Sequence, residues 1–341
     1  MSYNNKAYLA KFLVPFTLAS ICPAVHADHG GLGVGIGIAS PIVTDSAITL
    51  PAGKWVVGER TQLISWDTFT NSQLHDIKHA NEGTPKEDVH SIGYTLNPSV
   101  YAAYGITDTV TLGLKLPASL RYNVREAAHE EGESVNRLGN STGFGDISAF
   151  GQWRFWFSQD NATHASLIAG LKMPTGSTRS RNSLGELFEA HFQPGSGSWD
   201  PFLGGAFTHG LGQFSFDSSV MYQFATPGTQ STNLGDGFQY NLALSYALGG
   251  VAPSVLYASS NAAGWVLVGE LNGEWHAKQK AFGEYDPNTG GNTVYLSPGV
   301  RYAGGANWNI SLSFGIPIVR DAYGYQDNPD YRIVNRISLL F

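Results

Sequence analysis

The sequence is poor in cysteine and in charge, and it has no long apolar stretch beyond its first residues. Cys22 is the only cysteine among 341 residues, so no disulfide can form within the chain. Charged residues make up 14%, against roughly a quarter in soluble proteins. No run of about 18 apolar residues follows the N-terminal region, which argues against membrane-spanning helices. The net charge of −7 argues against nucleic acid as a partner.

The first 27 residues have the three parts of a secretory signal peptide. Lys6 and Lys11 supply the positive charge, residues 12–21 form the apolar core, and cleavage after Ala27 fits the small residues there. Cleavage would also remove Cys22. The alternative use of Cys22 as a lipid-anchor site fits poorly, because Ile21 stands where a small residue is wanted. We therefore expect residues 1–27 to be a signal peptide and the mature chain to be exported.

Strict alternation of apolar and polar side chains recurs through the rest of the chain. Between residues 308 and 318, every second residue is Trp, Ile, Leu or Phe, and those between are Asn, Ser, Gly or Pro. Successive side chains of a strand point to opposite faces, so a period of two predicts strands, and helical spacing does not fit. A soluble β-sandwich also alternates. However, its polar face is usually rich in Lys and Glu, and the aromatic residues here gather near strand ends, as in membrane-interface girdles. The pattern favours an all-β, antiparallel transmembrane β-barrel.

Segment lengths predict about twelve strands, given the roughly ten residues that a tilted membrane strand needs. Their centres are expected near Val57, Pro98, Leu114, Ala149, Ala169, Gly204, Ser219, Leu244, Leu271, Gly299, Phe314 and Ile337. Tight turns are expected at 105–108, 158–163, 209–212 and 304–307, and long polar loops at 67–91, 122–142, 175–198, 226–236, 281–292 and 321–330. Short periplasmic turns and long extracellular loops are typical of outer-membrane barrels. Residues 249–264 hold either a short strand or a longer periplasmic turn.

The last eleven residues, 331–341, alternate apolar residues with Arg332, Arg336 and Ser338 and end on Phe341. This segment resembles the terminal strand of bacterial outer-membrane β-barrels. The resemblance implies that Phe341 is an assembly signal read by the barrel-assembly machinery, and that the protein is located in the outer membrane, in contact with its lipid. The barrel itself is expected to span residues 54–341.

Residues 28–53 form a separate segment between the expected cleavage site and the first strand. They include five glycines at alternate or adjacent positions between 30 and 37, without the spacing or the preceding strand of a dinucleotide-binding loop. Two interpretations are open: a flexible periplasmic tail, or a plug in the barrel mouth. The apolar residues Leu32, Val34, Ile36, Ile38, Ile42 and Val43 favour burial.

Several short motifs resemble one known family. They are GFGD at 143–146, LKMPTG at 171–176, GSWD at 197–200, LPAG at 50–53, YLSPG at 295–299 and the closing segment 330–341. Together they resemble the outer-membrane transporter-like proteins named for the meta-pathway of phenol degradation. The resemblance covers nearly all of the mature chain. It implies a membrane barrel and suggests uptake of small organic compounds, but it does not identify which residues of this sequence would take part in transport.

Charged residues in the strands are expected to face the lumen, because on a lipid face each would cost roughly 2–4 kcal/mol near the midplane. The candidates for a solute path are Lys115, Asp146, Arg154, Lys172, Asp200, Asp217, Glu270, Glu274, Arg301, Arg332 and Arg336. They form either a salt-bridged packed core or a ladder of opposed charges along a narrow wet pore. Inward Phe150, Phe202 and Tyr295 would narrow such a pore or contact an aromatic solute.

Catalytic and metal-binding alternatives have weaker support. His164 and Ser166 share the inward side of one strand, but the chain has no G-x-S-x-G nucleophile motif. The first long loop is rich in possible metal ligands, namely His75, Asp76, His79, Glu82, Glu87, Asp88 and His90. A solvated polar loop that binds no metal often has the same composition. We therefore expect no enzyme activity, no metal and no cofactor.

The sequence thus predicts an outer-membrane channel for passive passage of small, hydrophobic or aromatic organic solutes. Selectivity would come from lumen charges and from the loop 175–198, which carries Arg179, Arg181, Glu186, Phe188, Glu189 and His191. The rival is a non-conducting structural or surface-binding barrel, which a well-filled lumen would favour.

Overall fold

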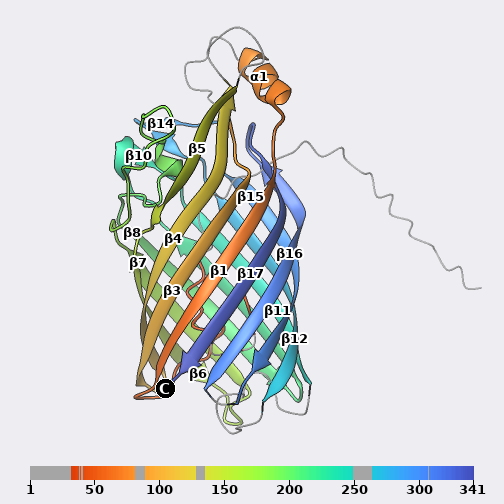
Figure 1. Cartoon of the computed structure of the whole chain (residues 1–341). Helices are drawn as coiled ribbons and strands as arrows, with labels where there is room; N and C mark the ends of the chain where they lie inside the picture. The colour runs from red at the N-terminus through yellow and green to blue at the C-terminus, as the bar shows by residue number, and fades with distance from the viewer. Residues whose placement is uncertain are drawn as a thin grey trace, which may run out of the picture.

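The computed structural model describes residues 32–37, 39, 41–80, 89–127, 135–248, 263–305 and 307–341. The expected signal peptide and the connection 249–262 lie outside these residues. The chain forms a tall cylinder of tilted strands with a short helix at one end (Figure 1). Within the described residues, no helix has both the length and the apolar character needed to cross a bilayer.

The elements follow one another as successive up and down strands. Their bounds are β1 (Trp55–Asp67), α1 (Asn71–Ala80), β2 (His90–Ser91), β3 (Tyr94–Thr107), β4 (Val110–Ala127), β5 (Val135–Phe144), β6 (Ser148–Phe157), β7 (Thr163–Lys172), η1 (Ala190–Phe192), β8 (Asp200–Leu211), β9 (Phe214–Gln223), η2 (Thr229–Ser231), β10 (Thr232–Asn233), β11 (Gly237–Leu248), β12 (Gly264–His276), β13 (Lys280–Ala281), β14 (Glu284–Tyr285), β15 (Gly291–Ala303), β16 (Trp308–Ala322) and β17 (Asn328–Leu340).

The sheet closes on itself as a barrel of twelve strands. The first strand, β1, pairs antiparallel with the last, β17, with Val57 opposite Leu339. The lower part of β4 pairs with β6 and its upper part with β5, so β5 and β6 share one position in the wall. The three residues between them, 145–147, break that strand. All twelve predicted centres fall within strands, which confirms the predicted fold class.

Apolar side chains point out of the barrel and polar side chains point in. On β16, Phe314 is 44% exposed whereas Ser313 is 2% exposed, and on β17 Leu339 is 45% exposed whereas Arg336 is 3% exposed. Trp153, Trp265 and Trp308 are exposed near the end of the barrel that carries the short turns. Such an apolar belt with an aromatic rim suits lipid, and water-soluble monomers rarely expose large apolar surfaces.

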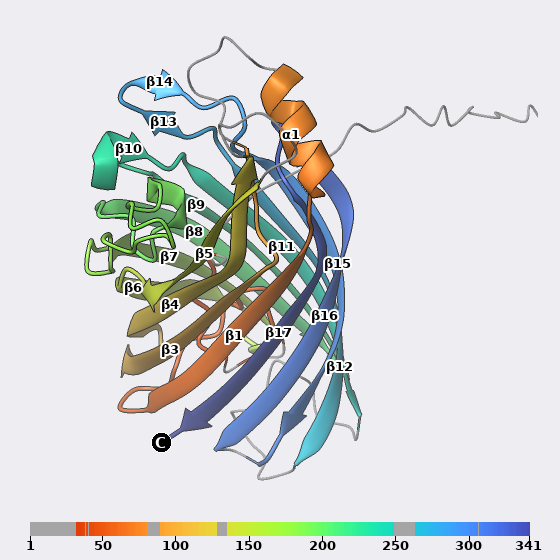
Figure 2. The same cartoon turned by 45° about the horizontal axis from the view of Figure 1, so that its top comes forward.

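The two ends of the barrel differ, as the sequence predicted. One end, here the turn end, carries short connections and the C-terminus; the other, the loop end, carries α1, η1 and the small strands (Figures 1 and 2). Several predicted boundaries were wrong, among them the turn at 105–108, since β3 continues to Thr107. Most of 122–142 is strand, because β4 and β5 keep pairing beyond the apolar belt, where backbone pairing no longer requires an apolar face. The turn predicted at 209–212 is later, since β8 continues to Leu211.

A single carboxylate anchors the base of the first long loop. Asp327, in the connection between β16 and β17, accepts hydrogen bonds from the backbone N–H of Ile92 at 2.6 Å and of Phe69 at 3.0 Å. Burial raises the pKa of Asp327 to about 6 from its ordinary value of 3.8. Because the folded state holds this proton more tightly than the unfolded chain, the resulting stability is present at low pH. It is lost as pH rises through about 6.

We expect the loop base to loosen between pH 4 and pH 7. The local opening free energy should fall by on the order of 2–3 kcal/mol for a pKa raised by about two units. Hydrogen exchange of the Ile92 and Phe69 amides, corrected for the intrinsic pH dependence, measures it. In Asp327→Asn this pH dependence should vanish, and identical profiles for the two proteins would refute the assignment.

Candidate functional site

The lumen is occupied by the chain's own N-terminal residues. We call residues 32–50 the lumen segment; its described part runs inside the barrel wall (red in Figure 2). Ile42, Ala47 and Leu50 are completely buried. The backbone N–H groups of Asp45, Ala47 and Leu50 donate hydrogen bonds to hydroxyl groups of three separate strands, Ser219 on β9, Thr208 on β8 and Thr111 on β4.

Glu270 on β12 is the principal anchor of the lumen segment. Its carboxylate accepts hydrogen bonds from three consecutive backbone N–H groups, those of Ile42 at 3.2 Å, Val43 at 3.0 and 3.1 Å, and Thr44 at 2.9 Å. The Glu270 side chain is buried. Successive N–H groups that converge on one anion form a strong charge-assisted arrangement. Glu270, one of the residues predicted along a solute path, therefore binds the lumen segment in this structure.

Basic and amide side chains hold the carbonyl groups of the same segment. Arg301 Nη2 and Asn309 Nδ2 both donate to the Gly37 carbonyl, at 3.2 and 3.0 Å. Lys115 Nζ donates to the Gly33 carbonyl at 3.2 Å. Gly37 has φ +66°, and a Cβ there would lie 2.3 Å from Ser338 Oγ. Only glycine fits, because both the left-handed backbone and the missing side chain are required.

Apolar packing completes the fill. Val34, Ile36 and Leu50 form one buried cluster with wall residues that include Phe150 and Phe202. Ile42 and Val43 form a second cluster with valines of β12 and β17. Phe150 and Phe202, which were expected to narrow a pore or contact a solute, pack in this cluster with the lumen segment, and Phe202 also lines the cavity described below.

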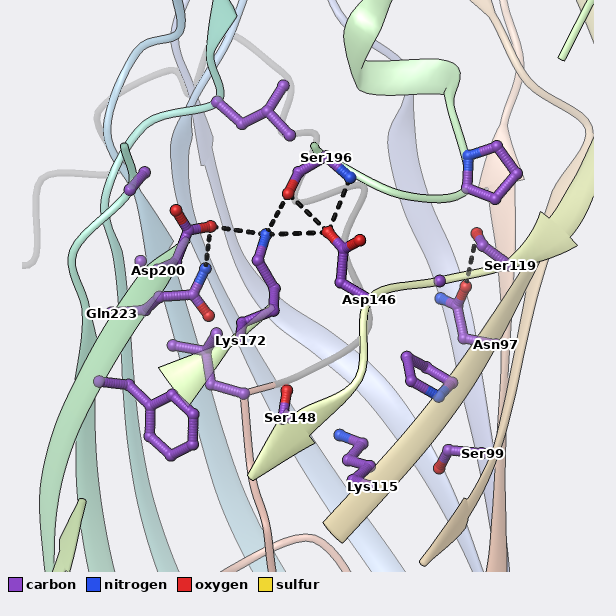
Figure 3. A pocket seen from close by; sticks show the side chains of 18 of the residues that line it. Asn97, Ser99, Lys115, Ser119, Asp146, Ser148, Lys172, Ser196, Asp200 and Gln223 are labelled. Atoms are coloured by element: carbon purple, nitrogen blue, oxygen red, sulfur yellow. Dashed lines mark hydrogen bonds and ion pairs between the residues drawn. The ribbon is translucent and has the colours of Figure 1, made fainter. Parts of the chain in front are cut away.

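A cavity of about 130 Å³ lies toward the loop end (Figure 3). Leu32 and Val34 of the lumen segment form one wall, and Pro194 and Ser196 of the connection between β7 and β8 form another. Strand residues complete it. They include Asn97, Ser99, Lys115, Ser148, Lys172, Asp200, Phe202 and Gln223. The cavity thus combines apolar surface with charges of both signs.

A lysine and two aspartates form the strongest polar network at this cavity. Lys172 Nζ lies 2.5 Å from Asp200 Oδ2, 3.6 Å from Asp146 Oδ2 and 2.6 Å from Ser196 Oγ (Figure 3). Asp146 also accepts the backbone N–H groups of Gly176 and Ser196, each at 2.8 Å. Because Asp146 lies in the break between β5 and β6, the network ties that break to the connection that leaves β7.

The network explains three of the sequence motifs. GFGD supplies Asp146, LKMPTG supplies Lys172 and Gly176, and GSWD supplies Asp200. A Cβ on Gly176 would lie 2.7 Å from the Gly195 Cα, so the two backbones touch where the chain passes itself. Motifs that are distant in sequence therefore meet at one point of the wall.

The remaining predicted residues are dispersed around the lumen. Arg332 Nη1 pairs with Glu274 Oε1 at 2.7 Å, and its guanidinium lies 4.0 Å from the Tyr295 ring centre. Asp217 accepts hydrogen bonds from Thr208 and Ser215. Arg154 contacts His164 near the turn end, and Arg336 is buried. All eleven residues are buried or half-buried; their part in a solute path stays a prediction.

Sequence reasoning missed two buried arginines and one buried aspartate. Arg60 and Arg121 face inward, and Asp45 lies in the lumen segment. The alternation of faces could have placed Arg121 in the lumen, since it is an even number of residues from Lys115 on the same strand. Pro117, however, interrupts the alternating pattern. Asp45 had no signal, because the lumen segment has no strand periodicity.

The alternative sites can also be located. His164 bonds to Arg154 and to the Asn161 carbonyl, and Ser166 Oγ donates to the Ala47 carbonyl at 2.6 Å. The described hydrogen bonds of His164 and Ser166 therefore join neither side chain to the other. In the first long loop, Glu82, Glu87, Asp88 and the side chain of His79 lie outside the described residues; His90 lies on β2, against Glu126.

Fold and site together define the class: a β-barrel of the bacterial outer membrane, with an apolar face toward lipid and a lumen filled by its own N-terminal segment. The family model described as "Putative MetA-pathway of phenol degradation" matches residues 79–325, and the chain belongs to this family. No curated protein matches the chain.

Solved structures with the same fold include an outer membrane channel from Pseudomonas putida F1. It is 15% identical, with a TM-score of 0.57, over 86% of this chain and 98% of that one. A monoaromatic hydrocarbon channel, CymD, matches at 11% identity and a TM-score of 0.36, over 85% of this chain and 88% of that one. A Pseudomonas aeruginosa FadL homologue matches at 8% identity and a TM-score of 0.38, over 94% and 98%. The first establishes the barrel fold; the other two are too distant to add to it.

Proposed function

We propose that this protein is an outer-membrane channel for small, partly hydrophobic organic solutes. A solute enters the 130 Å³ cavity from the loop end and passes when the lumen segment moves. The main observation that supports this proposal is the position of the cavity, between the connection from β7 to β8 on one side and the lumen segment on the other. We propose that the solute passes down its own concentration gradient.

The size and lining of the cavity favour a solute of one ring. An apolar cavity of about 150 Å³ is known to hold benzene. Phe202, Leu32 and Val34 supply apolar surface, and Lys172 and Asp200 lie close enough to hydrogen-bond one polar substituent. The family description, which names phenol degradation, agrees with a hydroxylated aromatic compound.

Titration calorimetry of phenol into the detergent-solubilised barrel tests this proposal. Ser148→Trp places an indole in the cavity and should weaken phenol binding at least about tenfold. Ala149→Trp is the matched control, because Ala149 lies opposite Leu114 on the lipid face. Uptake of labelled phenol by cells with an intact outer membrane should follow the same order. Equal binding by both variants would refute the cavity as the solute site.

The filled lumen also supports a second candidate, a closed barrel that conducts nothing and acts through its loops. Two results together would favour this closed barrel over the channel. Cells with the protein would take up no more phenol than cells without it, and planar bilayers would show no current under any condition that moves the lumen segment.

A further inference from the structure

A cluster of histidine and glutamate side chains lies at the loop end, outside the cavity. His90 comes from β2, and Glu189 and His191 come from the η1 region of the connection between β7 and β8. One ligand atom from each of the three lies within 4.8 Å of the others. The His191 Nδ1 to Glu189 Oε2 distance is 3.4 Å. His90 is about 100 positions from the other two in sequence, so the fold and not a local motif brings it to them.

We propose that His90, Glu189 and His191 bind a divalent transition-metal ion of the Zn²⁺ type. Two imidazoles and one carboxylate are a ligand set that zinc accepts in proteins, with a further position left for water. Ligand atoms around tetrahedral zinc are about 3.3 Å apart for bonds of about 2.0 Å. Side-chain rotations that move each ligand atom by about 1 Å would therefore bring the three atoms to this spacing.

Glu126 on β4 supports this assignment from behind the ligands. Its Oε2 lies 3.2 Å from His90 Nε2, and Asn136 Nδ2 donates to its other oxygen, also at 3.2 Å. With the proton on Nε2 donated to Glu126, the lone pair that a metal needs is on His90 Nδ1. A carboxylate on the far nitrogen is the usual outer partner of a metal-binding histidine, and it makes the imidazole a stronger ligand.

The surroundings hold both imidazoles in place and leave an approach for the ion. The Phe192 ring centre is 4.9 Å from that of His90 and 4.0 Å from that of His191. The side chains of His90 and His191 are 8% and 17% exposed, whereas that of Glu189 is 50% exposed. The two carboxylates, Glu126 and Glu189, would attract a divalent cation to the two imidazoles, and Glu189 is the most exposed of the three proposed ligands.

Occupancy would have a mechanical consequence. Glu189 and His191 belong to the connection whose Pro194 and Ser196 line the cavity, and His90 and Glu126 belong to the wall beside it. A bound ion would therefore cross-link the connection to the wall and stiffen the outer mouth of the barrel.

The test uses the mature, full-length barrel without a histidine tag, stripped with chelator and titrated with Zn²⁺ by calorimetry at pH 7.5. We expect one Zn²⁺ per barrel, binding weakened at least about tenfold in His191→Ala and in Glu189→Gln, since one ligand is lost in each. His209→Ala is the matched control, because His209 lies near the turn end and should leave binding unchanged. Co²⁺ should give the visible absorption bands of a low-symmetry site in the parent and in His209→Ala, but not in His191→Ala or Glu189→Gln.

Folding does not limit this test. Glu189 is half exposed, so Glu189→Gln keeps the barrel intact, which heat-dependent mobility on a denaturing gel verifies. Zn²⁺ should also slow hydrogen exchange within residues 173–199 of the parent. The proposal is overturned if no saturable binding occurs, if both variants bind like the parent, or if millimolar Mg²⁺ displaces the ion, since Mg²⁺ prefers oxygen ligands.

Discussion

Glu270→Gln should turn a silent barrel into one that conducts in bursts. The substitution keeps the size of the side chain but removes its charge, and the amide nitrogen cannot accept the N–H groups that the carboxylate accepts from Ile42, Val43 and Thr44. Each hydrogen bond to a charged group is worth about 1.5–3 kcal/mol. Weakening this set by about 3 kcal/mol raises the population of a displaced lumen segment by roughly a hundredfold.

Single-channel recording in planar bilayers measures this effect. Deletion of residues 32–50 is the positive control and should give a steady open pore, because it removes the lumen segment but keeps the turn at 51–54 that enters β1. Glu284→Gln is the matched control, since Glu284 is an exposed glutamate on β14 and should leave the barrel silent.

Comparing the deletion with Glu270→Gln distinguishes the existence of a pore from the role of Glu270 in closing it. A deletion that conducts beside a silent Glu270→Gln would show that the pore exists but that Glu270 is not its anchor. A deletion that is itself silent would show that the wall side chains close the lumen unaided, and the channel proposal would fail.

Lys172→Met should lower the free energy of unfolding by about 3–5 kcal/mol, the range measured when one partner of a buried ion pair is removed. The substitution leaves Asp146 and Asp200 buried without their cation, and both are almost inaccessible to solvent. Asp146 also holds both ends of the connection between β7 and β8, through Gly176 and Ser196, so this connection should also lose protection from hydrogen exchange.

Guanidinium unfolding in lipid vesicles, followed by tryptophan fluorescence, measures the loss. Adding Asp200→Asn to Lys172→Met should restore part of the stability, because it removes one of the two stranded charges. Lys54→Met is the control on an exposed lysine. A change below about 1 kcal/mol, the range of exposed ion pairs, would show that solvent already screens the network.

The wall of the barrel could be predicted from sequence because the lipid enforces a period of two. The outward series Trp308 to Ile318 on β16 fixes the face of every neighbour between them, so Asn309 and Ser313 had to point inward. The same parity placed Glu270, Arg301 and Arg332 inside. Strand ends were less predictable, since β4 and β5 extend beyond the belt where lipid no longer selects the residues.

The contents of the lumen could not be predicted in the same way. The lumen segment has no regular secondary structure, and its hydrogen bonds run to residues such as Thr208 and Glu270, far along the chain. Its glycines and apolar residues suggested burial, but no local pattern names the partner. The network of Lys172, Asp146 and Asp200 was equally hidden, because the three motifs only become neighbours once β7 and β8 pair.

The way the sheet closes has a consequence for how the molecule assembles. The lumen segment immediately precedes β1, yet the groups that hold it belong to β4, β8, β9, β12, β15 and β16. Those strands surround a common interior only after the first and last strands have zipped together. We therefore expect the lumen segment, although it precedes β1 in the chain, to reach its final position only after the sheet has closed.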